Sequence, residues 1–210
     1  TGVDTIAISK WNNTNVAVVK DDGTLWTWGL NDAGQIGNGE FAQPEAPVQV
    51  MSKVKTVAVG NRFMAAIDSD GALWTWGDNS CGQLGNGSVM NVSQPHKVME
   101  EVESIELGDN FAVALKVDGS VWTWGANDVS QLGNGDKSQF DANPMRIIQG
   151  RERKPYQGVQ IMDSTLQLVV DEQVVICAKP VPLQADYHEW NWSTSDAGVA
   201  IVDERGVVTA

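Results

Sequence analysis

The chain has 210 residues and a mass of 22.7 kDa, with 42% hydrophobic and 20% charged residues, which is typical of a folded globular protein. Its formal net charge of −13 argues against a binder of nucleic acid or anionic membranes, since such proteins need a positive surface. The sequence contains no apolar run near the roughly 20 residues of a membrane-spanning helix. Nine Trp and 21 Gly are unusually many, and such a bias indicates a repeated pattern.

Two sequence patterns each occur three times at a constant spacing of 48 residues. Copies of Gly-x-Leu/Val-Trp-Thr-Trp-Gly begin at Gly23, Gly71 and Gly119. Copies of Gln-Ile/Leu-Gly-Asn-Gly follow in phase and begin at Gln35, Gln83 and Gln131. Six of the nine Trp belong to the first pattern, so the repeat explains the composition. Each copy is therefore expected to be one structural unit of fixed size.

The local signals inside each copy all favour β-strands. Strand candidates precede an acidic turn (15–20, 63–68, 111–117), lie upstream (56–59, 104–107) or follow a proline (48–51, 96–99, 145–148). The turn leads into the Trp-x-Trp strand, and Asp-Gly between two β-rich runs predicts a hairpin because Gly accepts a positive φ. Strands with apolar residues at both odd and even positions predict burial on both faces of the sheet, as in the stacked blades of a β-propeller.

The consensus Gly-x-Leu-Trp-x-Trp-Gly-x-Asn-x-x-Gly-Gln-Leu-Gly-x-Gly, over about residues 3–148, resembles the repeat of the regulator of chromosome condensation family. WD and kelch repeats have other patterns. The resemblance implies an all-β fold that begins with a partial β-propeller of three four-stranded blades. Propellers close with about 4 to 8 blades, so we favour a piece of a longer protein; the alternative is self-association that completes a ring. Ser130 stands where Gly34 and Gly82 precede Gln, and we expect a different backbone path there.

The repeat stops after Gln149, and we expect residues 150–156 to be a charged linker between the propeller repeats (1–149) and a second domain (157–210). Trp-x-Trp-Ser-x-Ser-Asp from Trp190 and Gly-Val-Val-Thr-Ala from Gly206 resemble the bacterial group 2 immunoglobulin-like domain of intimins and surface proteins. That family continues beyond this point, so an incomplete immunoglobulin-like β-sandwich is expected. The resemblance places the parent among bacterial secreted or cell-surface proteins.

Groups able to support catalysis or bind a metal are few. The only histidines are His96 and His188, and the only cysteines are Cys81 and Cys177, so we expect neither an enzyme nor a cofactor or metal site. The stretch Asp68-Ser69-Asp70-Gly71 is similar to the start of a calcium loop but lacks its remainder, and a hairpin turn is the preferred interpretation. We expect the Trp pairs to be core residues with buried acceptors for their indole N–H groups; the alternative is a platform for carbohydrate stacking.

Function is expected where the copies differ, because the shared residues build the scaffold. The variable stretches are 40–48, 88–94 and 136–143, and they follow the same turn in every copy. Their exposed apolar candidates for partner binding are Phe41, Met90 and Phe140. The alternative is that these three side chains pack against the neighbouring blade.

Two classes of function remain. The first is a non-catalytic binding or display module of a bacterial secreted or cell-surface protein, located outside the cell, whose propeller loops contact a protein or a glycan, with no nucleic acid and no membrane insertion. The second is a guanine-nucleotide-exchange-like regulator of a small GTPase, as the family resemblance implies. That activity depends on specialised loops, which the constant spacing does not provide. Residues 1–150 contain nine basic and 18 acidic residues, which disfavours chromatin binding.

Overall fold

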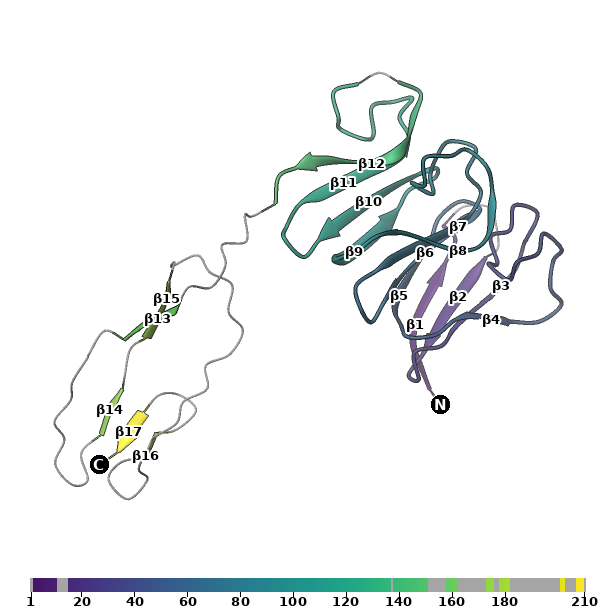
Figure 1. Cartoon of the computed structure of the whole chain (residues 1–210). Coiled ribbons are helices and arrows are strands. Elements are labelled where there is room, and N and C mark those ends of the chain that lie inside the picture. The colour runs from purple at the N-terminus through teal and green to yellow at the C-terminus, as the bar shows by residue number, and fades with distance from the viewer. Residues whose placement is uncertain are drawn as a thin grey trace. The chain divides into compact units, whose positions relative to one another are not determined.

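The computed structural model describes residues 2–10, 15–136 and 138–150, together with five short strands beyond residue 157. The chain divides into two compact units, Thr1–Arg151 and Glu152–Ala210, which are considered separately. All regular elements among the described residues are β-strands (Figure 1). That part of the chain contains no helix with the length and apolar character needed to cross a membrane.

The first unit consists of three four-stranded antiparallel sheets, each formed by one repeat, which succeed one another in chain order (Figure 1). The first sheet contains β1 (Val3–Ile8), β2 (Val16–Lys20), β3 (Leu25–Trp28) and β4 (Val48–Met51). The second contains β5 (Val54–Val59), β6 (Phe63–Asp68), β7 (Leu73–Gly77) and β8 (Val92–Met99). The third contains β9 (Val102–Leu107), β10 (Phe111–Lys116), β11 (Val121–Ala126) and β12 (Phe140–Ile148). The expected three four-stranded blades are confirmed.

The structure differs from the expected strand pattern at two places. β1 pairs with β2 from Val3 to Ile8, although the sequence singles out no upstream strand in the first copy. β8 and β12 begin several residues earlier than expected, because the pairing continues to Val92 opposite Gly77 and to Phe140 opposite Ala126. Part of the variable sequence therefore lies in outer strands rather than in loops.

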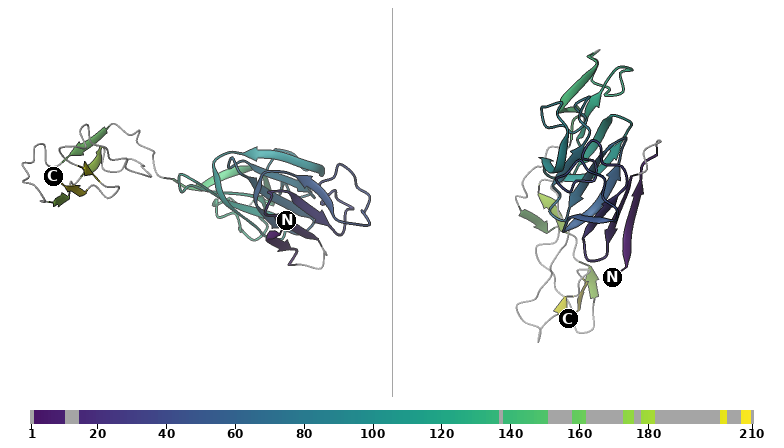
Figure 2. Two further views of the ribbon diagram at one scale, coloured as in Figure 1. Left: turned by 90° about the horizontal axis from the view of Figure 1, so that it is seen from below. Right: turned by 90° about the vertical axis from the view of Figure 1, so that its right-hand side faces the viewer.

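The hydrophobic core lies between the sheets. Along β6 every residue up to Ile67 is buried, and its side chains divide between two clusters. Phe63, Ala65 and Ile67 pack with residues of the third sheet, while Met64 and Ala66 pack with residues of the first. The turned views of Figure 2 show the sheets layered in this way. Burial on both faces is thus confirmed for the central sheet.

In the second unit, β13 (Gly158–Ile161) pairs with β15 (Ala178–Val181). A three-stranded sheet has the order β14 (Gln173–Val175), β17 (Val207–Thr209) and β16 (Ile201–Val202). Several residues that the sequence singles out fall outside the described residues: Cys177, His188, and the Trp pair at 190 and 192. The immunoglobulin-like sandwich therefore stays a prediction.

Candidate functional site

Three long connections join the third and fourth strands of the sheets and cover residues 29–47, 78–91 and 127–139, of which 137 is not described. Because the sheets have equivalent topology, these connections leave from the same edge, which we call the loop edge (Figure 1). The short hairpin turns between the second and third strands lie at the other end of the strands, which we call the turn edge. The sequence prediction that the variable stretches cluster on one face is consistent with this arrangement.

A buried asparagine fixes the path of each loop. The side-chain amide of Asn79 donates hydrogen bonds to the carbonyl oxygens of Ser88 (2.9 Å) and Met90 (3.0 Å), and its Oδ1 accepts one from the backbone N–H of Leu84 (3.0 Å). Asn31 makes equivalent bonds in the first loop. Sequence reasoning gave these residues no role, although the Gly-x-Asn of the repeat marks their position. The variable residues therefore project from a preorganised backbone.

A tryptophan from the following sheet anchors each of the first two loops. The indole N–H of Trp76 donates to the carbonyl oxygen of Gln35 (3.0 Å), and that of Trp124 donates to Gln83 (2.9 Å). A Cβ at Gly37, whose φ is +86°, would lie 2.7 Å from Nε1 of Trp76. Glycine is thus required there by the close approach of the ring as well as by φ. We call this contact the tryptophan lock.

The prediction that all six repeat tryptophans are core residues is only partly right. Trp76 and Trp124 are fully buried, whereas the first Trp of each pair and Trp28 are partly buried. Among the described residues no sheet precedes the first one, so Trp28 contacts no loop of the kind that buries Trp76 and Trp124. The indole N–H groups at the first positions donate to side-chain oxygens, namely those of Thr24, Asp68 and Ser120.

The expectation of a different backbone path at Ser130 is wrong. Its φ of 63° matches the left-handed values of Gly34 (79°) and Gly82 (70°). A Cβ at Gly34 would lie 2.7 Å from Ser93, and one at Gly82 would lie 2.6 Å from Ala142, both in the following sheet. The third loop has no following sheet among the described residues. A side chain is therefore tolerated at Ser130, apart from the strain of its φ.

The three candidate binding residues are exposed on or beside the loop edge. Phe41 is 53% exposed, Met90 is 76% exposed and Phe140, which opens β12, is 40% exposed. Val129, at 77%, belongs with them, but sequence reasoning missed it because it precedes the Gln-Leu-Gly pattern outside the variable stretches. A role of these residues in binding stays a prediction, and their exposure leaves them accessible to a partner.

The regulator of chromosome condensation (RCC1) repeat model matches residues 22–67, 70–115 and 118–160, and a second model of this repeat matches residues 54–83 and 102–131. The chain belongs to the RCC1-repeat family. No curated protein matches it. Human WBSCR16 is similar in structure, with 19% identity, a TM-score of 0.62, and coverage of 75% of this chain and 42% of that one. Prp20p from Saccharomyces cerevisiae has 22% identity, a TM-score of 0.63, and coverage of 70% and 38%.

These likenesses show the RCC1 propeller fold. This chain spans less than half of the length of either structure. The Prp20p structure was described together with its binding properties to Gsp1p and histones. Another structure contains Kap60 bound to yeast RCC1 (Prp20), with 20% identity to this chain.

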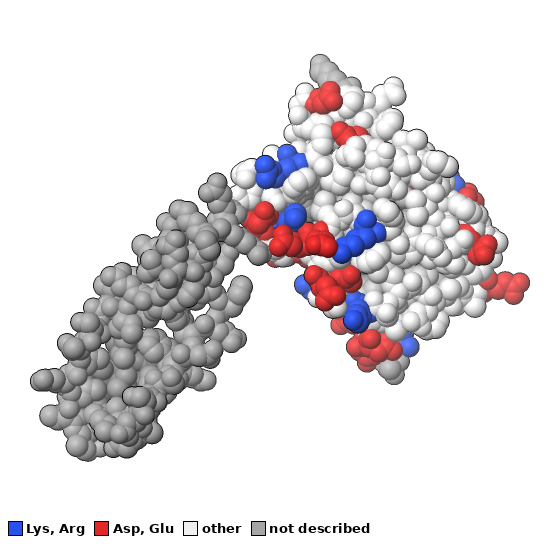
Figure 3. All heavy atoms as spheres, in the orientation of Figure 1, with Lys and Arg blue, Asp and Glu red and all other residues white. Residues whose placement is uncertain are grey.

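Charged residues lie at both edges of this RCC1-repeat unit, and acidic residues outnumber basic ones at each. Figure 3 shows Lys and Arg gathered with Asp and Glu along the turn edge, while most other atoms on the visible face are uncharged. Acidic residues predominate on the loop edge, where Arg62 Nη2 contacts Asp32 Oδ2 at 2.7 Å. Partial burial opposes ionisation of Asp32, but hydrogen bonds from Gln35 and the guanidinium of Arg62 outweigh it and lower its pKa. The loop edge therefore combines apolar side chains with negative charge.

The stretch that is similar to the start of a calcium loop has a structural role in this unit. Asp68-Ser69-Asp70-Gly71 is a hairpin turn, as preferred, in which Asp68 Oδ1 accepts hydrogen bonds from the N–H groups of Asp70 and Ala72. His96 is exposed on β8, and Cys81 is a partly buried free thiol. Within the described residues, His, Cys, Asp and Glu side chains form no group of three or more that could hold a metal ion.

Proposed function

We propose that the RCC1-repeat unit is a protein-binding module and that its loop edge contacts the partner. The observation that carries this proposal is the exposure of Phe41, Met90 and Val129 on loops whose backbone is fixed by buried hydrogen bonds. A preorganised apolar surface loses little conformational entropy when it binds. The protein partners named for the Prp20p structures support a protein over a glycan.

The charge of the loop edge indicates the chemistry of the partner. Asp78, Asp109 and Asp128 lie in connections of the same edge, so a surface with basic residues around an apolar centre is complementary. Such an interface forms faster at low salt, because opposite charges steer the encounter. A glycan without positive charge gains nothing from this field.

The test compares two sets of serine substitutions at exposed apolar positions. The triple variant Phe41→Ser, Met90→Ser and Val129→Ser removes the apolar surface of the loop edge, while Val117→Ser changes a 46%-exposed residue on the turn edge. Wild-type and variant chains are immobilised and exposed to a protein extract of the organism that encodes the chain. Recovery of a partner by wild type and Val117→Ser but not by the triple variant supports the proposal. Equal recovery by all three chains contradicts it.

We also propose that the module is displayed outside a bacterial cell, joined to an immunoglobulin-like stalk. The support is the Trp-x-Trp-Ser and Gly-Val-Val-Thr-Ala patterns of residues 157–210. Fractionation of cells that express the complete gene tests the location. Recovery of the protein only in the cytoplasm contradicts it.

The alternative is a guanine-nucleotide-exchange-like regulator, for which the family resemblance is the support. A nucleotide-release assay with candidate small GTPases tests this function, and acceleration by the chain would favour it over a pure binding module. Self-association is a further expectation. Trp28 is equivalent to the tryptophans that form the tryptophan lock, and the loop around Gly133 is equivalent to the loops that receive them, so the two can meet between chains. A solution mass above that of one chain, reduced to it by Trp28→Ala, would support self-association.

A further inference from the structure

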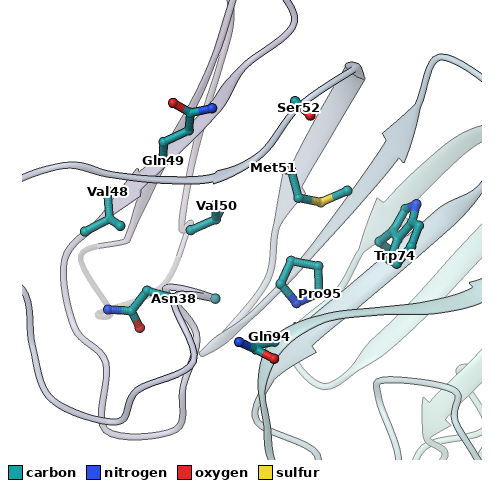
Figure 4. A pocket seen from close by; sticks show the side chains of 10 residues that line it. Asn38, Val48, Gln49, Val50, Met51, Ser52, Trp74, Gln94 and Pro95 are labelled. Carbon is teal, nitrogen blue, oxygen red and sulfur yellow. The ribbon is translucent and has the colours of Figure 1, made fainter.

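A groove of about 520 Å³ lies between the outer strands of the first two sheets (Figure 4). Residues 48–52, which comprise β4 and Ser52, form one wall, and Gln94 and Pro95 of β8 form the other. Trp74 lies beyond Pro95, and the side chain of Met51 extends toward it. Gly37 and Asn38 of the first loop complete the lining. The groove is thus separate from the exposed apolar residues of the loop edge.

The backbone of β4 borders this groove. β4 is the terminal strand of its sheet and pairs only with β3, so alternate N–H and C=O groups of its outer edge face away from the sheet. Five consecutive residues line the groove, and the register of β4 shifts between the pairs Leu25–Met51 and Trp26–Gln49, which interrupts the regular alternation of its side chains. The strand edge itself, and not one face alone, is therefore presented to an occupant.

Trp74 supplies an apolar surface in a fixed orientation. Its indole N–H donates to Oδ2 of Asp68 at 2.8 Å, and the ring is partly buried. In the other two copies a cation lies over the equivalent ring, Lys20 at 5.6 Å and Arg146 at 6.0 Å. Lys97, which is paired in register with Trp74, instead contacts Glu100 at 2.6 Å.

Comparison of the first two repeats shows that residues 48–52 of the groove wall are uncharged where the second repeat has charged residues. Forty-eight residues further on, the positions of Val48, Gln49 and Ser52 are occupied by His96, Lys97 and Glu100. Val50 and Met51 recur as Val98 and Met99, so the scaffold is shared and the charge is not. None of the residues that line the groove is ionisable. The lining therefore offers no charged group to pair with a charged side chain of a ligand, which favours an uncharged segment.

We propose that the groove binds an extended, uncharged peptide segment that adds a strand to the edge of β4 and places an apolar side chain against Trp74. Backbone hydrogen bonds to a sheet edge supply affinity in this mode, and side-chain pockets supply specificity. The side-chain amides of Gln49 and Gln94 can donate to and accept from further peptide groups, whereas Oδ1 of Asn38 already accepts from the backbone N–H of Glu40 and from the side chain of Asn31. At about 3.3 Å per residue, the four residues of β4 accommodate a segment of similar length. A neutral oligosaccharide lacks the backbone N–H and C=O groups of a strand pairing.

The test selects binders from a display library of octapeptides composed only of uncharged residues, with the full chain as target. We expect enriched peptides that shift the indole N–H resonance of Trp74, assigned by its loss in Trp74→Phe. Methylation of alternate backbone nitrogens in such a peptide should weaken binding at least tenfold, because it removes the donors of a strand pairing. The absence of any enriched peptide that shifts this resonance overturns the proposal.

Two matched double variants change the charge at equivalent positions of the first and second repeats. Gln49→Lys with Ser52→Glu gives the groove the residues of the next copy, and Lys97→Gln with Glu100→Ser removes charge outside the lining. We expect the first to weaken peptide binding at least tenfold and the second to leave it unchanged, with both chains retaining wild-type circular dichroism. Equal affinity for both variants overturns the proposal, as does a resonance shift caused by maltohexaose and not by peptide.

Discussion

Replacement of Trp76 by alanine tests how much the tryptophan lock stabilises the contact between the first two sheets. The side chain is fully buried, and truncation of a buried Trp or Phe to alanine costs about 3–5 kcal/mol. The substitution also leaves the carbonyl oxygen of Gln35 without its hydrogen bond of 3.0 Å, which adds about 1 kcal/mol. We therefore expect Trp76→Ala to lower the free energy of unfolding by about 4–6 kcal/mol.

The matched control is Trp28→Ala, at the same position of the first repeat but outside any lock among the described residues. Because Trp28 is only partly buried, we expect a loss of about 1–2 kcal/mol. Urea unfolding followed by far-ultraviolet circular dichroism measures both. A difference below about 0.5 kcal/mol between the two variants would refute the reasoning, since the lock is what distinguishes these residues.

Three further predictions concern the loops and turns. Gly37→Ala should destabilise more than Gly119→Ala in thermal unfolding: both have positive φ, but a Cβ meets Trp76 at Gly37 and nothing within 4 Å at Gly119. Asn79→Ala should lower the free energy of unfolding by about 2–3 kcal/mol and increase the rate of proteolysis within 78–91. An unchanged rate would show that the loop keeps its conformation without the side chain of Asn79. Partial burial alone would raise the pKa of Asp68, but hydrogen bonds from Trp74 and from the backbone outweigh it and lower the pKa below 3.8. The ionised Asp68 therefore stabilises the fold fully above about pH 5, and this stabilisation is lost as the pH falls below 3.8. Asp68→Asn should flatten that acid-side slope in urea titrations.

The sequence by itself determined the repeat, the hairpin turns and the strands other than β1 of the first unit. These depend on local chemistry: Asp-Gly sets the turn between β2 and β3 or between β10 and β11, and apolar residues at both parities set the burial of β6. The constant spacing of 48 residues implied equivalent sheets, and the loops with Phe41 and Met90 could be located from it. The groove beside β4 could not, because its walls come from two repeats that only packing brings together.

Only the tertiary structure decided which copies of a repeated residue are equivalent in environment. Trp28 and Trp76 are identical in local sequence, yet only Trp76 enters the loop of a preceding sheet and is fully buried. Ser130 replaces a glycine without a change of backbone path, because the neighbour that approaches Gly34 and Gly82 is absent from its surroundings among the described residues. A repeat fixes the local conformation of each copy, but burial depends on which sheet packs against it.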